Sequence, residues 1–395
     1  MTNEESKLFD QFHHYFPGNT DDIRVFFAPG RVNLIGEHTD YNGGYVLPAA
    51  LSLGTYMITR PRKDGLYRLR SANFADQPVD FTKDTLFYLE EDGWGNYPKG
   101  VIRELQSEGV PTTGADVFYY GNLPNGAGLS SSASIGMVTA FGLSSLSRQY
   151  VDLQNLALLC QRMENNFIGV KTGIMDQFAV GYCKKDYALF LNCDTLEKEK
   201  VKLKLPSYKL VITNTNKRRG LSDSKYNERL NECQEALKVL QQVNPSWTNL
   251  SAISLEEFNH NADRLPTTLR ARARHVISEN ARVIKSVELL KDNDLEGFGE
   301  LMKASHISLR DDYEVTGQEL DALFAAQSSV PGCIGTRMTG AGFGGCTVSI
   351  VAEEALEEFK RFVSASYRSE MGLDATFYVC ETGNGVREIK QEVIS

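Results

Sequence analysis

Hydrophobic and polar positions along this chain alternate between strand-like and helix-like spacing. Apolar residues recur at helical spacing in residues 4–16, where Leu8, Phe12 and Phe16 share one face, and again in 130–148 and 152–167. Helical spacing predominates later, at 224–243, 268–291, 295–310, 317–328 and 353–370. Short apolar runs bounded by turn residues predict strands at 24–28, 45–51, 53–62, 66–74, 115–124, 208–215, 346–352 and 375–380.

The order of these elements predicts a chain of two domains without internal repeats or a low-complexity linker. A length of 395 residues favours two domains. The charged run at 196–207, LEKEKVKLKLPS, interrupts the apolar pattern, so we predict a boundary near residue 200 and domains 1–200 and 201–395.

Composition and charge narrow the class of protein. Apolar residues make up 42% and charged residues 24% of the chain, which is enough for a packed core. A formal net charge of −9 argues against nucleic acid or an acidic membrane as partner, because either favours a basic face. Any anionic substrate must therefore find its positive partners locally, in an arginine, a metal ion or a helix N-terminus.

The cysteines and the chain ends suggest a cytoplasmic protein. The seven cysteines are scattered, odd in number and free of C-x-x-C pairs, which disfavours a disulfide framework or a structural zinc site. We expect free, mostly buried thiols. The acidic start MTNEESKLFDQF does not resemble a signal peptide, and no apolar run is long enough to span a bilayer.

The stretch GAGLSSSAS at 126–134 combines glycines with a helix start. Gly126 and Gly128 let the backbone turn sharply, and the serines Ser130, Ser131 and Ser132 supply hydroxyls. The helix N-terminus offers free N–H groups and a positive dipole end, so we predict phosphate binding here rather than an ordinary capped turn. The loop is not a Walker A motif, because no Lys-Ser or Lys-Thr follows the glycines.

A second glycine cluster, at 340–345, matches G-x-G-x-x-G. A strand-like run follows it, whereas a dinucleotide fingerprint requires a helix, so we reject dinucleotide binding. The remaining interpretation is a tight loop beside the ligand.

Glu164 lies on the apolar stripe of the helix predicted at 152–167. A buried carboxylate is costly without a partner. It is either one half of an ion pair with a distant arginine or a Mg²⁺ ligand, and Ser132 would then be the partnering hydroxyl.

Two further polar groups interrupt apolar surroundings. The loop 29–44 concentrates Arg31, Glu37, His38 and Asp40 between two strands, a density of donors and acceptors that suits a polyol such as a sugar. A solvated loop with self-paired charges is the alternative, and a metal site on His38 and Asp40 rests on a single histidine. Asp176, inside the apolar run GIMDQFAV, is either a helix N-cap or a functional acid; on its own the pattern favours the cap.

Several segments together resemble the GHMP kinase superfamily and, within it, the galactokinases, over almost the whole chain. The similarity rests on PGRVNLIGEHTDYNGG at 29–44, GAGLSSSAS at 126–134 and TRMTGAGFGGC at 336–346, with GIMDQFAV and SKYNER in the expected order. It implies an α+β fold of two domains, an N-terminal one like ribosomal protein S5 domain 2 and a C-terminal ferredoxin-like one, with the active site between them.

The resemblance also implies residue roles. Asp176 would be the catalytic carboxylate, and Arg31 would hold it ionised and steady the phosphoryl group. The implied sugar-binding residues are Glu37, His38, Thr39, Asp40 and Tyr226. The implied ATP-binding residues are Ser71, Trp94, Gly126, Ala127, Gly128, Leu129, Ser130, Ser131 and Ser132. Ser132 and Glu164 would hold Mg²⁺.

The implied reaction is transfer of the ATP γ-phosphoryl group to the C1 hydroxyl of α-D-galactose, in galactose catabolism, by an enzyme that we expect to be a monomer. Alternatives within the superfamily are kinases of N-acetylgalactosamine, arabinose, mevalonate or homoserine. The dense polar loop favours a sugar over the last two. A non-catalytic galactose and ATP sensor, or a carbohydrate-binding module without nucleotide, are alternatives of other classes.

Overall fold

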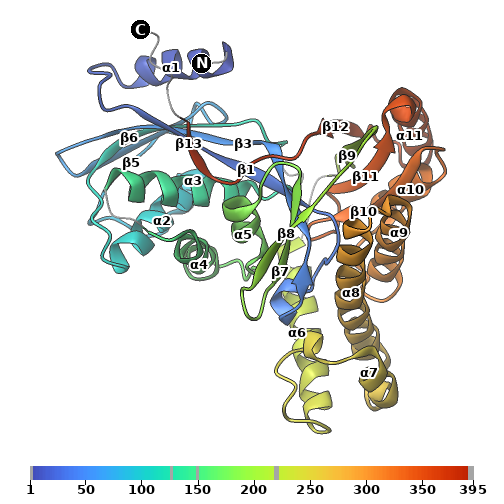
Figure 1. The fold of residues 1–395 in the computed structure, drawn as a ribbon. Coiled ribbons are helices and arrows are strands. Elements are labelled where there is room, and N and C mark those ends of the chain that lie inside the picture. Colours follow the sequence, from blue (N-terminus) through green and yellow to red (C-terminus); the bar gives the residue numbers. More distant parts are fainter. Residues whose placement is uncertain (1–2, 125–127, 148–150, 218–221, 390–395) are drawn as a thin grey trace.

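The computed structural model describes residues 3–124, 128–147, 151–217 and 222–389 as a mixed α+β protein of two lobes (Figure 1). The helices are α1 (Asn3–Tyr15), α2 (Asn96–Ser107), α3 (Ser131–Leu146), α4 (Leu153–Met163), α5 (Met175–Tyr182), α6 (Ser222–Gln241), α7 (Leu255–Asn261), α8 (Thr267–Lys291), α9 (Leu295–Asp311), α10 (Gln318–Ser328) and α11 (Leu356–Met371). The strands are β1 (Arg24–Asn33), β2 (Tyr45–Val46), β3 (Pro48–Pro61), β4 (Leu66–Ser71), β5 (Val79–Thr82), β6 (Ala115–Gly121), β7 (Tyr187–Asn192), β8 (Lys198–Lys202), β9 (Tyr208–Asn214), β10 (Cys333–Thr339), β11 (Cys346–Ala352), β12 (Thr376–Cys380) and β13 (Arg387–Ile389).

The first lobe is a six-stranded sheet in the order β13-β1-β3-β6-β4-β5, antiparallel except for the β4–β6 pair. Helices α2 to α5 cover one face and α1 the other (Figure 1). Apolar side chains such as Phe26, Met137 and Phe178 fill the space between the sheet and α2 to α5. On the opposite face, Leu8 and Phe12 of α1 are buried against the sheet, as their helical spacing predicts.

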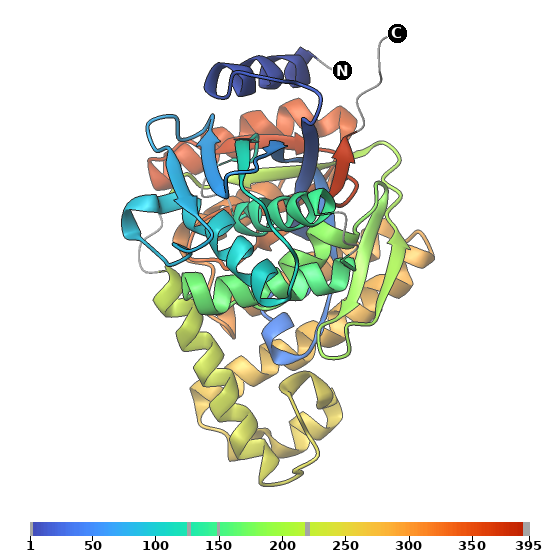
Figure 2. The same cartoon turned by 90° about the vertical axis from the view of Figure 1, so that its left-hand side faces the viewer.

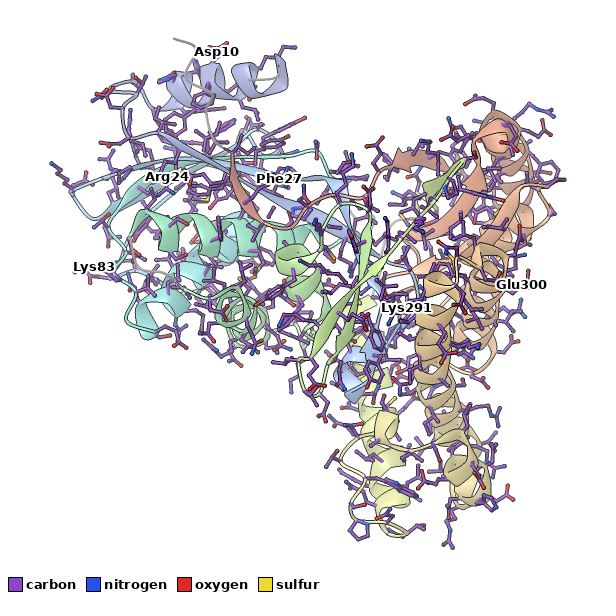
Figure 3. All side chains as sticks on the ribbon, viewed as in Figure 1. Asp10, Arg24, Phe27, Lys83, Lys291 and Glu300 are labelled. Carbon is purple, nitrogen blue, oxygen red and sulfur yellow. The ribbon has the colours of Figure 1, made fainter. Side chains whose placement is uncertain are left out.

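The second lobe is built on a four-stranded antiparallel sheet in the order β10-β11-β9-β12. Helices α6, α7 and α8 form an extension that projects away from the first lobe's sheet (Figures 1 and 2). A small third sheet, β2-β7-β8, lies between the lobes. Lys291 at the end of α8 reaches it (Figure 3), and its ammonium lies 2.8 Å from Glu199 on β8.

The structure corrects several element boundaries. The strand expected to end at residue 28 continues through Pro29 and Gly30 to Asn33, with a register shift between Pro29 and Arg31. The separate strands expected at 45–51 and 53–62 are mostly one strand, β3. Helices α2, α5 and α7 and strands β5, β7, β8, β10 and β13 were not predicted. The helix expected over 152–167 ends as an α-helix at Met163 and continues as a π-helical turn, Glu164–Ile168.

Other expectations concern the chain as a whole. The α+β class of two domains is confirmed, whereas the boundary near residue 200 remains a proposal; β13, which lies beyond it, pairs with β1 of the first sheet. The seven cysteines are free, and all but Cys193 are buried, as predicted. Within the described residues, none of the helices has both the length and the apolar character that a bilayer span requires.

Candidate active site

The irregularity in β1 positions Arg31. A side chain at Gly30 would place its Cβ 2.7 Å from the carbonyl oxygen of Leu129, so only glycine allows the loop before α3 to approach this closely. The backbone N–H of Arg31 donates to that same carbonyl at 3.2 Å, and its guanidinium donates to the Gly128 carbonyl at 2.7 Å. Strand β1 and the phosphate-loop candidate are therefore locked together around this arginine.

Asp176 forms a two-point ion pair with Arg31. The Arg31 Nε and Nη2 atoms donate to its two carboxylate oxygens at 2.7 and 2.8 Å. Ser130 Oγ donates to Asp176 Oδ2 at 2.5 Å. The N-cap interpretation was wrong, because Ile174 occupies the N-cap of α5 and Asp176 is the second residue of the helix, within its first turn. The carboxylate instead joins β1, α5 and the loop before α3.

The phosphate-loop candidate ends at the start of α3. Ser130 has left-handed backbone angles (φ 60°, ψ 46°), a costly conformation for serine, and its hydroxyl is directed to Asp176 rather than capping the helix. Helix α3 begins at Ser131, so its first N–H groups have no partner within the helix. Gly128 and Leu129 hold Arg31, as described above, whereas Gly126 and Ala127 lie outside the described residues.

An aromatic-lined cavity, here called the aromatic pocket, opens beside this helix start. Its volume is about 200 Å³. Ser71, Trp94, Ser131 and Ser132, four of the predicted ATP-binding residues, line it together. Sequence reasoning missed other lining residues, which include Asn73, Phe74, Tyr97 and Tyr119. Phe74 stacks on Trp94 with an interplanar angle of 12°, and Phe74 is 43% exposed, which leaves a flat apolar surface open to a ligand.

A second cavity, of about 130 Å³, is lined by Arg31 and Asp176 and is here called the polar pocket. Its predicted lining residues come from both lobes, namely Arg31, Glu37, His38, Asp40, Asp176 and Tyr226. The structure does not bring Thr39 into it: the Thr39 hydroxyl donates to the carbonyls of Gly36 and Tyr45 and is fully buried. Thr39 therefore closes the loop rather than lining the pocket.

Glu37 is held from the second lobe. Arg337 on β10, fully buried, lies 2.8 Å from Glu37 Oε2, and the backbone N–H of Gly340 donates to Oε1 at 3.0 Å. Sequence reasoning missed Arg337, because its segment, CIGTRMT, contains two threonines and a glycine and so has no apolar run in which an arginine would stand out. Gly340 and Ala341 also line the polar pocket, which supports the expectation of a tight loop beside the ligand.

Burial shifts the pKa of two groups in the polar pocket. It lowers the pKa of the His38 imidazole to about 3, which keeps the ring neutral. It raises the pKa of the Asp40 carboxyl to about 7, and the neighbouring negative charge of Asp176 adds to the shift. A Cβ at Gly173 would lie 1.8 Å from Asp40 Oδ2, so glycine at that position makes room for the carboxylate.

Glu164 is buried, as predicted. The side chains around its carboxylate suit a metal ligand better than one half of an ion pair. Thr172 and Gln177 donate to Oε2 at 3.0 and 3.2 Å, Ser132 also contacts the carboxylate, and Oε1 has no hydrogen-bond partner among the described residues. Among the described residues, no arginine forms an ion pair with the Glu164 carboxylate. The described residues hold no cluster of three potential metal ligands, so a metal on His38 and Asp40 gains no support. A single carboxylate with a hydroxyl suits Mg²⁺ that also binds phosphate.

Family models match three stretches of this chain, which contain most of the residues that join the two pockets. A model described as the galactokinase galactose-binding signature matches residues 10–61, which contain Arg31 and the loop that follows it. The GHMP kinase N-terminal domain matches 96–184, and the C-terminal domain matches 286–369. A galactokinase of Halalkalibacterium halodurans is 60% identical over 93% of both chains, and one of Bacillus subtilis is 49% identical over 95% of this chain and 97% of that one.

This chain belongs to the galactokinase family. A solved structure of Lactococcus lactis galactokinase complexed with galactose covers 98% of this chain and all of that one, with a TM-score of 0.94 and 42% identity. The mevalonate kinase of Methanococcus jannaschii shares the fold, with a TM-score of 0.64 at 20% identity. The galactose-binding signature contains Arg31, Glu37, His38 and Asp40 of the polar pocket. The GHMP N-terminal match contains Ser132, Glu164 and Asp176.

Proposed function

We propose that this chain transfers the γ-phosphoryl group of ATP to the C1 hydroxyl of α-D-galactose, yielding α-D-galactose 1-phosphate and ADP. The observation that carries the proposal is the position of Asp176, which lines the polar pocket and hydrogen-bonds to Ser130 at the end of the phosphate-loop candidate. A sugar in the polar pocket and a nucleotide in the aromatic pocket would meet at this carboxylate.

The nucleotide would bind with its base against Trp94 and Phe74 and its phosphates at the start of α3. The N–H groups and dipole of that helix favour phosphate, and the Ser131 and Ser132 hydroxyls lie beside them. Glu164 and Ser132 would hold a Mg²⁺ ion, which when bound supplies positive charge to the phosphate oxygens.

The sugar would bind through Glu37, His38, Asp40 and Tyr226. Arg337 and the Gly340 N–H fix the Glu37 carboxylate, and Asp40 lies beside Asp176, so the polar groups converge from both lobes on one small volume. Convergent donors and acceptors in a cavity of this size suit a monosaccharide.

In the reaction, a bond forms between the sugar O1 and the γ-phosphorus while the bond from that phosphorus to the β-bridging oxygen breaks. The hydroxyl proton passes to Asp176. Arg31 holds the carboxylate in place and, through its proximity to the phosphate loop, counters negative charge on the transferring group. Positioning and electrostatics provide most of the catalysis in reactions of this type.

The test is ADP release by the purified chain with ATP, Mg²⁺ and one sugar at a time. We expect galactose to give a kcat/KM at least ten times that of glucose, N-acetylgalactosamine or arabinose. Equal or faster turnover of one of the other sugars would contradict the choice of galactose. Tight binding of galactose and ATP without ADP release would indicate a sensor instead.

A further inference from the structure

A short 3₁₀ turn, Glu90–Gly95, places Trp94 in the wall of the aromatic pocket and is here called the Trp94 turn. Its backbone is kinked at Gly93, whose angles (φ 46°, ψ −115°) are not helical. The indole N–H of Trp94 donates to the Gln77 carbonyl at 3.1 Å, and the ring meets Tyr119 edge-on, with 5.7 Å between the ring centroids. A turn with an interrupted backbone thus sets the orientation of the indole ring.

Helix α2 holds the Trp94 turn through a buried lysine. Lys99 is 1% exposed, and its ammonium forms an ion pair with the carboxylate of Asp92, which lies two residues before Trp94. The same ammonium lies 5.4 Å from the centre of the Phe81 ring on β5. Among the described residues, Asp92 is the one carboxylate paired with Lys99. Because a buried ammonium without its partner is strongly destabilising, Lys99 favours the arrangement of the turn that keeps Asp92 in place.

A second side chain of α2 fixes the backbone of the same turn. Asn96 is 1% exposed, and its amide donates to the carbonyls of Leu89 and Gly93 at 2.6 and 3.2 Å. Its side-chain oxygen accepts from the Leu89 N–H at 3.2 Å. Asn96 therefore holds the backbone on both sides of Asp92, and Lys99 holds the Asp92 side chain. The turn is tied to α2 before, at and after Asp92.

We propose that Lys99 is a positioning residue for the nucleotide, which through Asp92 holds the Trp94 turn so that the indole ring can stack on the base. The proposal rests on the placement of the nucleotide in the aromatic pocket, which is part of the proposed function. Lys99 lines neither pocket, so it acts on the ligand through the turn. The phosphates bind at the start of α3, which the ion pair does not hold. Lys99 therefore affects binding of the base and leaves binding of the phosphates unchanged.

The test measures binding of two fragments of ATP, namely adenosine, which lacks the phosphates, and inorganic tripolyphosphate, which lacks the base. Lys99→Met keeps an unbranched apolar chain and removes the charge. We expect it to weaken adenosine binding about tenfold, as for the loss of one base–aromatic stack, and to leave tripolyphosphate binding within about twofold of wild type. Isothermal titration calorimetry in the presence of Mg²⁺ measures both affinities. An unchanged adenosine affinity, or an equal loss for both ligands, would overturn the proposal.

A control variant separates this role from a general loss of stability. Asp116, at the start of β6, is 1% exposed and forms ion pairs with Arg60, Arg62 and Arg68. Asp116→Asn therefore weakens buried ion pairs of the same lobe that do not involve the Trp94 turn. We expect its Tm to fall and its adenosine affinity to stay near that of wild type. A loss of adenosine affinity as large as that in Lys99→Met would overturn the proposal.

A second variant, Asp92→Asn, tests the ion pair from its other side. Because both residues act through one contact, their effects on adenosine affinity should not add, and the double variant should bind adenosine no more weakly than the weaker single variant. Effects that add in full would contradict the proposal. If Lys99→Met does not fold, Asp92→Asn alone should still weaken adenosine binding and spare tripolyphosphate binding. Wild-type affinity for adenosine in Asp92→Asn would overturn the proposal.

Tryptophan fluorescence reports on the Trp94 turn directly. The chain has two tryptophans, so in Trp247→Phe the emission comes from Trp94 alone. In this background we expect Lys99→Met to shift the emission of the free protein to longer wavelength, because the indole becomes more exposed to water, and an unchanged spectrum would overturn the proposal. Adenosine that binds without changing Trp94 emission would contradict the nucleotide site and the proposal together. Adenosine that changes Trp94 emission equally, with equal affinity, in the presence and absence of Lys99 would overturn the role of Lys99 alone.

Discussion

At the scale of single residues, the polar pocket depends on the close approach of Gly173 to Asp40. The Cβ of an alanine at position 173 would lie 1.8 Å from the Asp40 carboxylate and would displace it. We expect Gly173→Ala to raise the KM for galactose at least tenfold and to leave the KM for ATP nearly unchanged. Initial-rate kinetics with each substrate varied in turn checks this. An unchanged galactose KM would remove Asp40 from the sugar site.

The raised pKa of Asp40 has a consequence for stability. Because its carboxyl has a pKa of about 7 in the folded protein and 3.8 when unfolded, the folded state binds more protons between these values. The contribution of Asp40 to the free energy of unfolding therefore falls as the pH rises from about 4 to 7, because its carboxyl must ionise while buried. We expect the Tm of Asp40→Asn, relative to wild type, to increase from pH 5.5 to pH 8. A difference in Tm that is constant over this range would contradict a raised pKa.

At the scale of elements, the π-helical turn after α4 presents Glu164 to the start of α3. The turn continues the helix by five residues, and Glu164 Oε1 remains without a partner among the described residues. Glu164→Gln keeps the shape and removes the charge. We expect the Mg²⁺ concentration for half-maximal activity to rise at least tenfold, while the galactose KM stays within twofold. The reverse pattern would refute the metal role.

Sequence patterns predicted most of the elements that carry one continuous apolar face, although they missed α2, which buries Val101, Ile102 and Leu105. They also failed where two signals overlapped. The spacing of Leu8 and Phe12 predicted α1, because a helix on a sheet face needs only one such stripe. Proline and glycine at 29 and 30 indicated the end of a strand, yet β1 continues because the register shift there absorbs the irregularity. Helix α5 was missed because Asp176 interrupts its apolar run.

For the site, too, local sequence patterns predicted some residues and missed others. The glycines and serines before α3 indicate phosphate binding from local chemistry alone, and Glu164 stands out because it lies on an apolar stripe. The pairing of Glu37 with Arg337 joins residues 300 positions apart, and no local pattern encodes that contact. The resemblance to galactokinases named the sugar residues, whereas the exclusion of Thr39 required its hydrogen bonds.

At the scale of the whole molecule, buried charges of the second lobe hold the polar loop of the first. Glu279 on α8 accepts hydrogen bonds from the backbone N–H groups of Gly36 and Glu37, at 2.9 and 3.3 Å. Arg337 binds Glu37 and donates to the Asn33 carbonyl at 2.9 Å. The two lobes thus share one buried network, and the sugar-binding groups depend on both.

Breaking this network should therefore affect stability as well as binding. Arg337→Met leaves Glu37 buried without its partner, and we expect the free energy of unfolding to fall by about 3–5 kcal/mol. The control is Arg361→Met, because Arg361 is 75% exposed and its pair with Glu358 is worth little. Chemical denaturation measures both. A loss at Arg337 no greater than at Arg361 would contradict the inter-lobe role.

The central claim is that Asp176 is the group on which phosphoryl transfer to galactose depends. The most direct test is the kcat of Asp176→Asn with galactose and saturating ATP and Mg²⁺, in protein whose thermal unfolding confirms the fold. Asparagine keeps the shape but neither accepts the hydroxyl proton nor balances the charge of Arg31. We predict a fall in kcat of about 10²–10⁴-fold. A kcat within tenfold of wild type would contradict the claim.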